Sequence, residues 1–182
     1  MKTITLKIFV SVMFLASVIA CSSDSVSEEN IDLTAPERLN RTSVWDGEIG
    51  TITEEGGLEL TANKEALITA FEDILIKQGN SARIENLEIV TKTATNDPFD
   101  KAYMVIGSNN SDTSIGVVLV RSGGGASLVL DERFEKPKSV TCRGCATGCN
   151  LEYLNTTDGK RVPYCNVNGC ISDCTKLETE VK

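Results

Sequence analysis

The chain contains no histidine. Histidine is the commonest general base in enzymes and the commonest side-chain ligand of transition metals, so its absence removes the usual route to both functions. The remaining polar residues form no recognisable catalytic set, and we expect no catalytic residue, no cofactor and no metal ion. The carboxylates that a hydrolase would need, Glu54, Glu55, Asp97 and Asp100, fall in predicted turns and solvated faces.

Positive charge is also scarce. The chain has 18 basic and 26 acidic residues and a net charge of −8. The first twenty residues contain two lysines and no acidic residue, so the rest of the chain is more acidic still. Binding to nucleic acid or to an anionic membrane surface depends on clustered Lys and Arg. We therefore expect no nucleic-acid partner, and we interpret the acidity as a feature that favours solubility.

No apolar run is long enough to span a bilayer, which takes about 20 residues. The longest, Ile8 to Ala20, has thirteen uncharged residues, follows Lys2 and Lys7, and is followed at once by the polar run Ser22 to Asp24. A short positive segment before an apolar stretch of this length is typical of a secretory signal. The pattern predicts a signal peptide over residues 1–20.

The end of this apolar run carries a motif, Val18-Ile19-Ala20-Cys21. It resembles the lipobox of bacterial lipoproteins. The resemblance implies that Cys21 receives a diacylglyceryl group, with palmitate among its acyl chains, and becomes the first residue of the mature protein. Two or more acyl chains anchor a protein stably to a membrane. The expected partner is thus a lipid bilayer, in the cell envelope, with the outer membrane or cell surface favoured over the inner membrane.

Residues 21–43 are polar and interrupted by Pro36. Such a composition buries too little apolar surface to offset the entropy of ordering, so it predicts a flexible, lipidated tether. Beyond it, the sequence divides into a domain over residues 44–135 and a cysteine-rich segment over residues 136–182.

The clearest helical pattern lies between Thr61 and Gly79, where apolar residues recur at three- and four-residue spacing. Asn63 is the expected N-cap, and Gly79-Asn80 is the expected end. Six runs around it have the character of strands, separated by short turns that favour antiparallel pairing. They are residues 48–53, 58–61, 83–93, 103–107, 114–121 and 126–130.

These elements predict an α+β fold: an antiparallel meander sheet with one long helix packed on it, plus a small disulfide-rich C-terminal segment. The run Ser122-Gly123-Gly124-Gly125 lacks the Gly-Lys-Ser/Thr ending of a phosphate-binding loop and joins two predicted strands. We interpret it as a hairpin turn.

The C-terminal segment is dominated by cysteine. Of the seven cysteines in the chain, Cys21 belongs to the lipobox, and an even six remain between positions 142 and 174. An even number of cysteines in a short exported segment is typical of a disulfide framework, and fifteen pairings are open. The candidates are Cys142, Cys145, Cys149, Cys165, Cys170 and Cys174.

Two other interpretations of these cysteines remain. Four thiolates could hold a metal ion or an iron–sulfur cluster, for which Cys142-x-x-Cys145 has a suitable spacing. The same pair could also be a redox-active dithiol, although Gly144 and Gly148 disfavour the helix that such a motif normally starts. Export from the cytoplasm favours structural disulfides over both.

Three functions follow from the sequence. The favoured one is a membrane-anchored, non-enzymatic binding or structural module of the cell envelope, with an unidentified protein or glycan ligand. The second is a metal or electron-transfer protein that uses the C-terminal cysteines. The third is a hydrolase that uses the carboxylates named above.

Overall fold

A computed structural model describes residues 43–145, 149–167, 170 and 174–181. The predicted signal peptide, Cys21 and all but the last residue of the predicted tether lie outside these residues. Among the described residues, no helix combines the length and the apolar character that crossing a bilayer requires.

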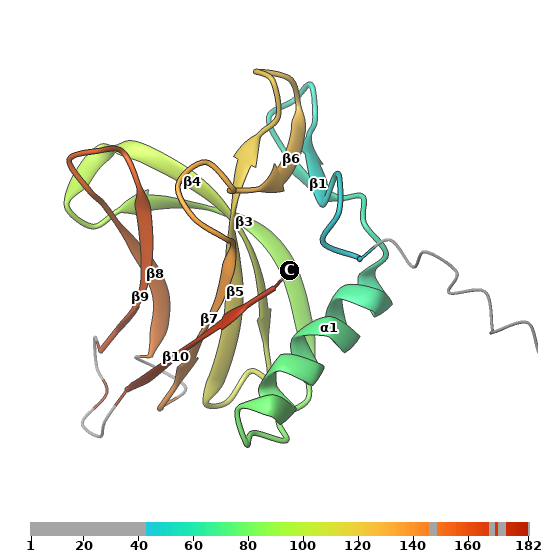
Figure 1. Cartoon of the computed structure of the whole chain (residues 1–182), viewed down its shortest axis with the longest axis vertical. Helices are drawn as coiled ribbons and strands as arrows, with labels where there is room; N and C mark the ends of the chain where they lie inside the picture. Colours follow the sequence, from blue (N-terminus) through green and yellow to red (C-terminus); the bar gives the residue numbers. More distant parts are fainter. Residues whose placement is uncertain (1–42, 146–148, 168–169, 171–173, 182) are drawn as a thin grey trace, which may run out of the picture. The chain divides into compact units, whose positions relative to one another are not determined.

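The described part of the chain forms one helix and ten strands (Figure 1). In chain order they are β1 (Gly50–Ile52), β2 (Leu58–Leu60), α1 (Lys64–Lys77), β3 (Asn86–Ala94), β4 (Asp97–Ser108), β5 (Thr113–Arg121), β6 (Ser127–Leu130), β7 (Lys138–Arg143), β8 (Asn150–Asn155), β9 (Arg161–Asn166) and β10 (Thr175–Glu180).

The predicted α+β class is wrong. Strands make up 49% of the described residues and helix only 11%, and the antiparallel sheet curls into a nearly closed, barrel-like shape. The helix is also short, with 14 residues from Lys64 to Lys77, so the sheet rather than a long helix dominates the fold. The main reason that the predicted class is wrong is the C-terminal segment, which contributes four strands that the prediction did not include.

Strand β5 lies at the centre of the main sheet. On one side, β5 pairs antiparallel with β4. On the other side, the first part of β5 pairs antiparallel with β7 and its last part with β6. Beyond β6 the sheet continues to β1 and β2, beyond β7 to β10, and beyond β4 to β3. Strands β8 and β9 form a separate two-stranded hairpin.

Successive side chains of a strand point to opposite faces of a sheet, and β5 uses both faces. Ile115, Val117 and Leu119 lie in one buried cluster, together with Phe71 and other residues of α1. Val118 lies in a second buried cluster, with residues of β8. Accordingly, α1 and the β8–β9 hairpin lie on opposite sides of β5 (Figure 1).

The ends of α1 follow from local chemistry, and both predicted end signals are confirmed. The side chain of Asn63 accepts a hydrogen bond from the backbone amide of Ala66 at 2.8 Å. This bond satisfies one of the free amides of the first turn. Gly79 has a φ of +75°. This left-handed conformation ends helices and favours glycine.

Gly116 allows the β8–β9 hairpin to approach the main sheet. A β-carbon at this position would lie 2.6 Å from Cδ2 of Leu151 in β8 and 2.9 Å from the carbonyl oxygen of Val105 in β4. Both distances are shorter than real contacts, and the second neighbour is backbone. A larger residue at this position therefore forces the hairpin or β4 to shift.

We expect Gly116→Ala to lower the free energy of unfolding by about 1–3 kcal/mol, the usual cost of overpacking. Urea denaturation measures the change. The matched control is Gly125→Ala, because a β-carbon there would meet only an ordinary contact at 3.4 Å. It should change stability by no more than about 0.5 kcal/mol. Equal stability of the two variants would contradict the tight approach at Gly116.

Candidate functional site

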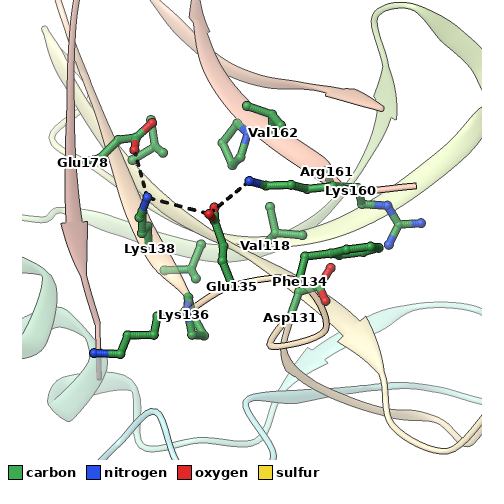
Figure 2. Close-up of a pocket in the computed structure, with 14 residues that line it drawn as sticks. Val118, Asp131, Phe134, Glu135, Lys136, Lys138, Lys160, Arg161, Val162 and Glu178 are labelled. Carbon is green, nitrogen blue, oxygen red and sulfur yellow. Dashed lines mark ion pairs between the residues drawn. The ribbon is translucent and has the colours of Figure 1, made fainter. Parts of the chain in front are cut away.

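A groove opens beside the β8–β9 hairpin, and we call it the β7–β9 groove (Figure 2). It encloses about 60 Å³, far less than the several hundred Å³ of a typical drug-sized ligand site. Charged side chains stand around an apolar floor. The groove is lined by Val117, Val118, Val140, Val162, Pro163, Phe134 and Pro137 and by the charged residues Asp131, Glu135, Lys136, Lys138, Lys160, Arg161 and Glu178.

Glu135 is the centre of the charged set. It lies on the irregular loop between β6 and β7, and its carboxylate is 3.0 Å from Nζ of Lys160 and 3.9 Å from Nζ of Lys138. Lys138 also lies 3.7 Å from the carboxylate of Glu178 in β10. Figure 2 shows the Glu135 carboxylate between the two ammonium groups. Three segments distant in the sequence therefore meet around these charges.

At one end of the groove, Arg161 forms a more buried ion pair with Asp100. Arg161, the first residue of β9, donates from Nη2 to Oδ1 of Asp100 at 3.0 Å and from Nε to Oδ2 at 3.3 Å. Both side chains are 18% exposed. The hydrogen bonds from Arg161 hold the pKa of Asp100 below its usual range, although partial burial opposes them. The pair fixes the start of β9 to the first part of β4.

Tyr153 of β8 packs beneath this pair. Its side chain is fully buried, and its hydroxyl donates to the backbone carbonyl of Asp100 at 2.8 Å. Burial, together with the nearby Asp100, raises the pKa of Tyr153 to about 12. The tyrosine is thus a neutral hydrogen-bond donor that anchors the hairpin, rather than a proton-transfer group near neutral pH.

The Asp100–Arg161 pair makes stability depend on pH, because the folded-state pKa of Asp100 is depressed. The stabilisation is present above the ordinary aspartate pKa of about 3.9 and is lost as the pH falls through the lower folded value. We expect Asp100→Asn to flatten the fall in stability between neutral and acid pH, measured by urea denaturation at a series of pH values. Asp73→Asn, at an exposed position of α1, should leave the slope unchanged. A wild-type slope in Asp100→Asn would contradict this role.

The cysteines of the C-terminal segment form three disulfides, which confirms the predicted framework. The pairs are Cys142–Cys165, Cys145–Cys170 and Cys149–Cys174, with Cα–Cα distances of 5.4, 5.7 and 5.5 Å. All three distances fall within the usual range for a disulfide. In the order of the sequence, each cysteine of the first three is joined to the corresponding cysteine of the last three.

The disulfides connect the hairpin to the main sheet. Cys142 is completely buried in β7, and its partner Cys165 lies in β9. Cys149 immediately precedes β8, and Cys174 immediately precedes β10. Gly144 lies against this cluster: a β-carbon there would be 3.0 Å from Cβ of Cys149. The absence of a side chain at this position lets the chain pass close to the sulfur atoms.

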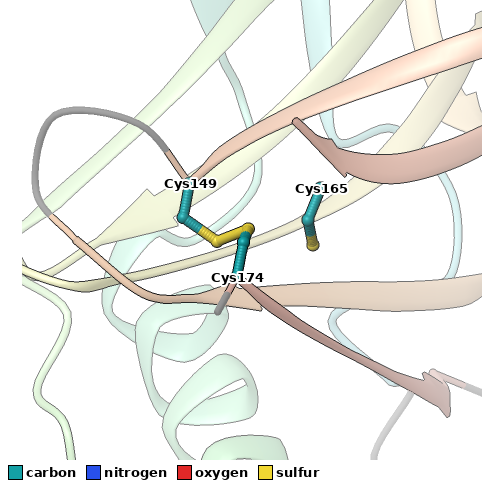
Figure 3. Close-up of side chains that lie close together, drawn as sticks. All are labelled: Cys149, Cys165 and Cys174. Atoms are coloured by element: carbon teal, nitrogen blue, oxygen red, sulfur yellow. A yellow bond between two sulfur atoms is a disulfide. The ribbon is translucent and has the colours of Figure 1, made fainter. Parts of the chain in front are cut away.

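The structure bears differently on the two alternative roles of these cysteines, a redox-active dithiol and a metal site. Cys142 lies within a strand and is bonded to Cys165, so it does not pair with Cys145 as a redox-active dithiol would. The Sγ atoms of Cys149, Cys165 and Cys174 lie within 4.8 Å of one another (Figure 3), a suitable distance for binding one metal ion. Metal ions bind thiolates, so this site would require reduction of two disulfides.

The carboxylates suggested for hydrolysis are divided between two hairpins. Glu54 and Glu55 are exposed in the turn between β1 and β2, whereas Asp97 and Asp100 belong to the first part of β4. Asp100 is engaged by Arg161. This arrangement gives no paired acid and base among these four residues.

Comparison with protein-family models, with curated proteins and with solved structures finds no match to this chain. The β7–β9 groove and the disulfide cluster are therefore the features of this chain from which a function can be inferred. The sequence pointed to the cysteines but not to the groove, whose charged residues resemble ordinary surface residues when each is considered in its own segment.

Proposed function

We propose that this chain is a lipid-anchored lipoprotein of the bacterial cell envelope and that its folded part is a non-enzymatic binding module. The observation that carries the proposal is the set of three disulfides between Cys142 and Cys174. Disulfides form and persist outside the reducing cytoplasm. That compartment agrees with the destination implied by the lipobox-like motif at Cys21.

The binding role is supported by the β7–β9 groove. Its apolar floor is rimmed by convergent charges, and polar groups that converge over an apolar surface are a feature of small-molecule sites. The groove is also built on strands held by two covalent connections, Cys142–Cys165 and Cys149–Cys174. Binding groups on a rigid support lose little conformational entropy when a ligand arrives.

Cys21→Ala tests the anchor. The full-length chain is expressed in a bacterium grown with a labelled palmitate analogue, and the label, the mature N-terminus and the membrane fraction are measured. We expect the wild type to be labelled, to begin at Cys21 and to fractionate with membranes, and we expect Cys21→Ala to lose the label and remain uncleaved. Ser22→Ala is the control that should behave as wild type. Label retained by Cys21→Ala, or a wild-type N-terminus elsewhere, would overturn the proposal.

A metal-binding function is the second candidate, because three sulfur atoms lie within 4.8 Å of one another. Mass spectrometry of the purified, non-reduced protein separates the two functions. Three disulfides lower the mass by that of six hydrogens relative to the reduced chain, and we expect this result. Free thiols together with bound zinc or iron would instead establish the second function.

A further inference from the structure

The cationic groups around the β7–β9 groove differ in how they are neutralised. Arg161 is held by two hydrogen bonds to Asp100, and Lys136 lies 3.3 Å from Glu180 at the edge of the sheet. Lys160, in contrast, lies 3.0 Å from the carboxylate of Glu135, and Lys138 lies between two carboxylates, 3.7 Å from that of Glu178 and 3.9 Å from that of Glu135. The second carboxylate near Lys138, that of Glu178, lies closer to Lys176, at 2.6 Å. Lys138 and Lys160 thus form a two-cation site in which the Glu135 carboxylate sits, with the Glu178 carboxylate on the Lys138 side.

The carboxylate in this site comes from a loop rather than from the sheet. Glu135 is 47% exposed and lies in the segment between β6 and β7 that has no strand or helix. Lys138 is the first residue of β7, and Lys160 lies in the short loop between β8 and β9, immediately before the first residue of β9. Exposed ion pairs of this kind contribute little to stability, typically no more than about 1 kcal/mol. Displacing Glu135 therefore costs little.

The surroundings of the two cations define what else a ligand must contain. Below them the floor is made of aliphatic groups, namely those of Val118, Val140, Val162 and Pro163. The space is about 60 Å³, which suits a few heavy atoms rather than a sugar chain or a peptide. A compact ligand with a carboxylate at one end and a short aliphatic chain at the other matches both features.

We propose that the β7–β9 groove binds a short-chain aliphatic carboxylate, which replaces the Glu135 carboxylate between Lys138 and Lys160 and places its hydrocarbon chain on the valine floor. Glu135 is then an internal competitor that sets the affinity. This inference names a ligand class for the proposed binding role and rests on that role. Its test is independent of Cys21, so that the ligand and the lipid anchor can fail separately.

The experiment is a titration of the isotope-labelled full-length chain, in detergent solution, with sodium butyrate, followed by amide NMR spectra. We expect saturable shifts at the amides of Lys138, Lys160 and Val162, with a dissociation constant in the millimolar range. Glu135→Gln keeps the size of the side chain but removes its charge. It should tighten binding by up to about fivefold, because the competing carboxylate, held by no more than about 1 kcal/mol, no longer occupies the site. Lys160→Met, introduced into Glu135→Gln, should abolish the tightening.

Two controls separate this mechanism from a general effect of charge. Glu180→Gln removes the same charge from the partner of Lys136 and should leave butyrate binding unchanged. Butyramide, the uncharged analogue of butyrate, should produce no saturable shift in any variant. The proposal is overturned if Glu135→Gln shows no saturable butyrate shift, if Glu180→Gln tightens binding equally, or if butyramide binds as well as butyrate. The spectra themselves report whether each variant is folded.

Discussion

Replacing Cys142 and Cys165 together by alanine should lower the free energy of unfolding by about 4 kcal/mol. The bridge closes a loop with a sequence separation of 23 residues. The chain-entropy model assigns about 3 kcal/mol to a loop of this length. The remainder comes from Cys142, which is completely buried in β7, where loss of its sulfur leaves a small cavity. Urea denaturation under non-reducing conditions measures the total.

The second bridge provides a matched control. Cys145–Cys170 closes a loop with a separation of 25 residues, but both cysteines are only half-buried. The double alanine variant at these positions should therefore lose the entropic contribution, about 3 kcal/mol, and little more. Losses below about 1 kcal/mol in both variants, well under the usual contribution of a disulfide, would show that the bridges do not hold the hairpin on the sheet. A larger loss at Cys145–Cys170 would contradict the packing role of Cys142.

Phe71→Ala should also destabilise the protein strongly, by about 3–5 kcal/mol, the usual range for removing a buried aromatic side chain. Phe71 is fully buried on α1, and its ring lies 5.2 Å from that of Trp45 in an edge-to-face arrangement. It also lies close against β4, where a β-carbon at Gly107 would be 3.2 Å from Cδ2 of the ring. The cavity therefore cannot close without moving backbone.

The control for Phe71 lies on the same helix. Ile76 is 62% exposed. Ile76→Ala should therefore change the free energy of unfolding by no more than about 0.5 kcal/mol. Thermal unfolding followed by circular dichroism measures both variants. Similar effects at the two positions would mean that α1 contributes to stability through its own helical propensity rather than through its contact with the sheet.

The parts of the fold that could be predicted are those with a local pattern. The apolar repeat of α1, with Asn63 before it and Gly79 after it, predicts a helix within three residues of its observed ends at Lys64 and Lys77. The continuous apolar run of β5 is typical of a strand with both faces buried, and β5 is central in the sheet. In both cases the signal lies within the element itself.

The C-terminal strands lack such a signal. Five of the six residues of β10 are exposed, and the strand is defined by antiparallel pairing with β7 from Thr175↔Arg143 to Glu180↔Lys138. Strand β9 contains Pro163, which disfavours a strand unless that strand lies at an edge, as it does in this two-stranded hairpin. These strands depend on tertiary partners, so the overall class was predicted as α+β when it is mostly β.

The same reason explains why the groove was not predicted. Glu135 and Lys160 are far apart in the sequence, and each is an ordinary charged residue in a polar segment. Only the placement of β9 beside β7 brings their charged groups to 3.0 Å. The disulfide framework was easier to predict, because an even number of cysteines in a short segment indicates disulfides without knowledge of the pairing.

The order of the disulfides has a consequence for how the protein matures. A chain is synthesised from its N-terminus, so Cys142, Cys145 and Cys149 emerge before any of their native partners. Oxidation at that moment joins cysteines that are not partners in the folded protein. Such bonds are corrected only when a thiolate attacks them and forms a mixed disulfide. Correct maturation therefore requires either delayed oxidation or an isomerase, and the yield of native protein should depend on which of these the host supplies.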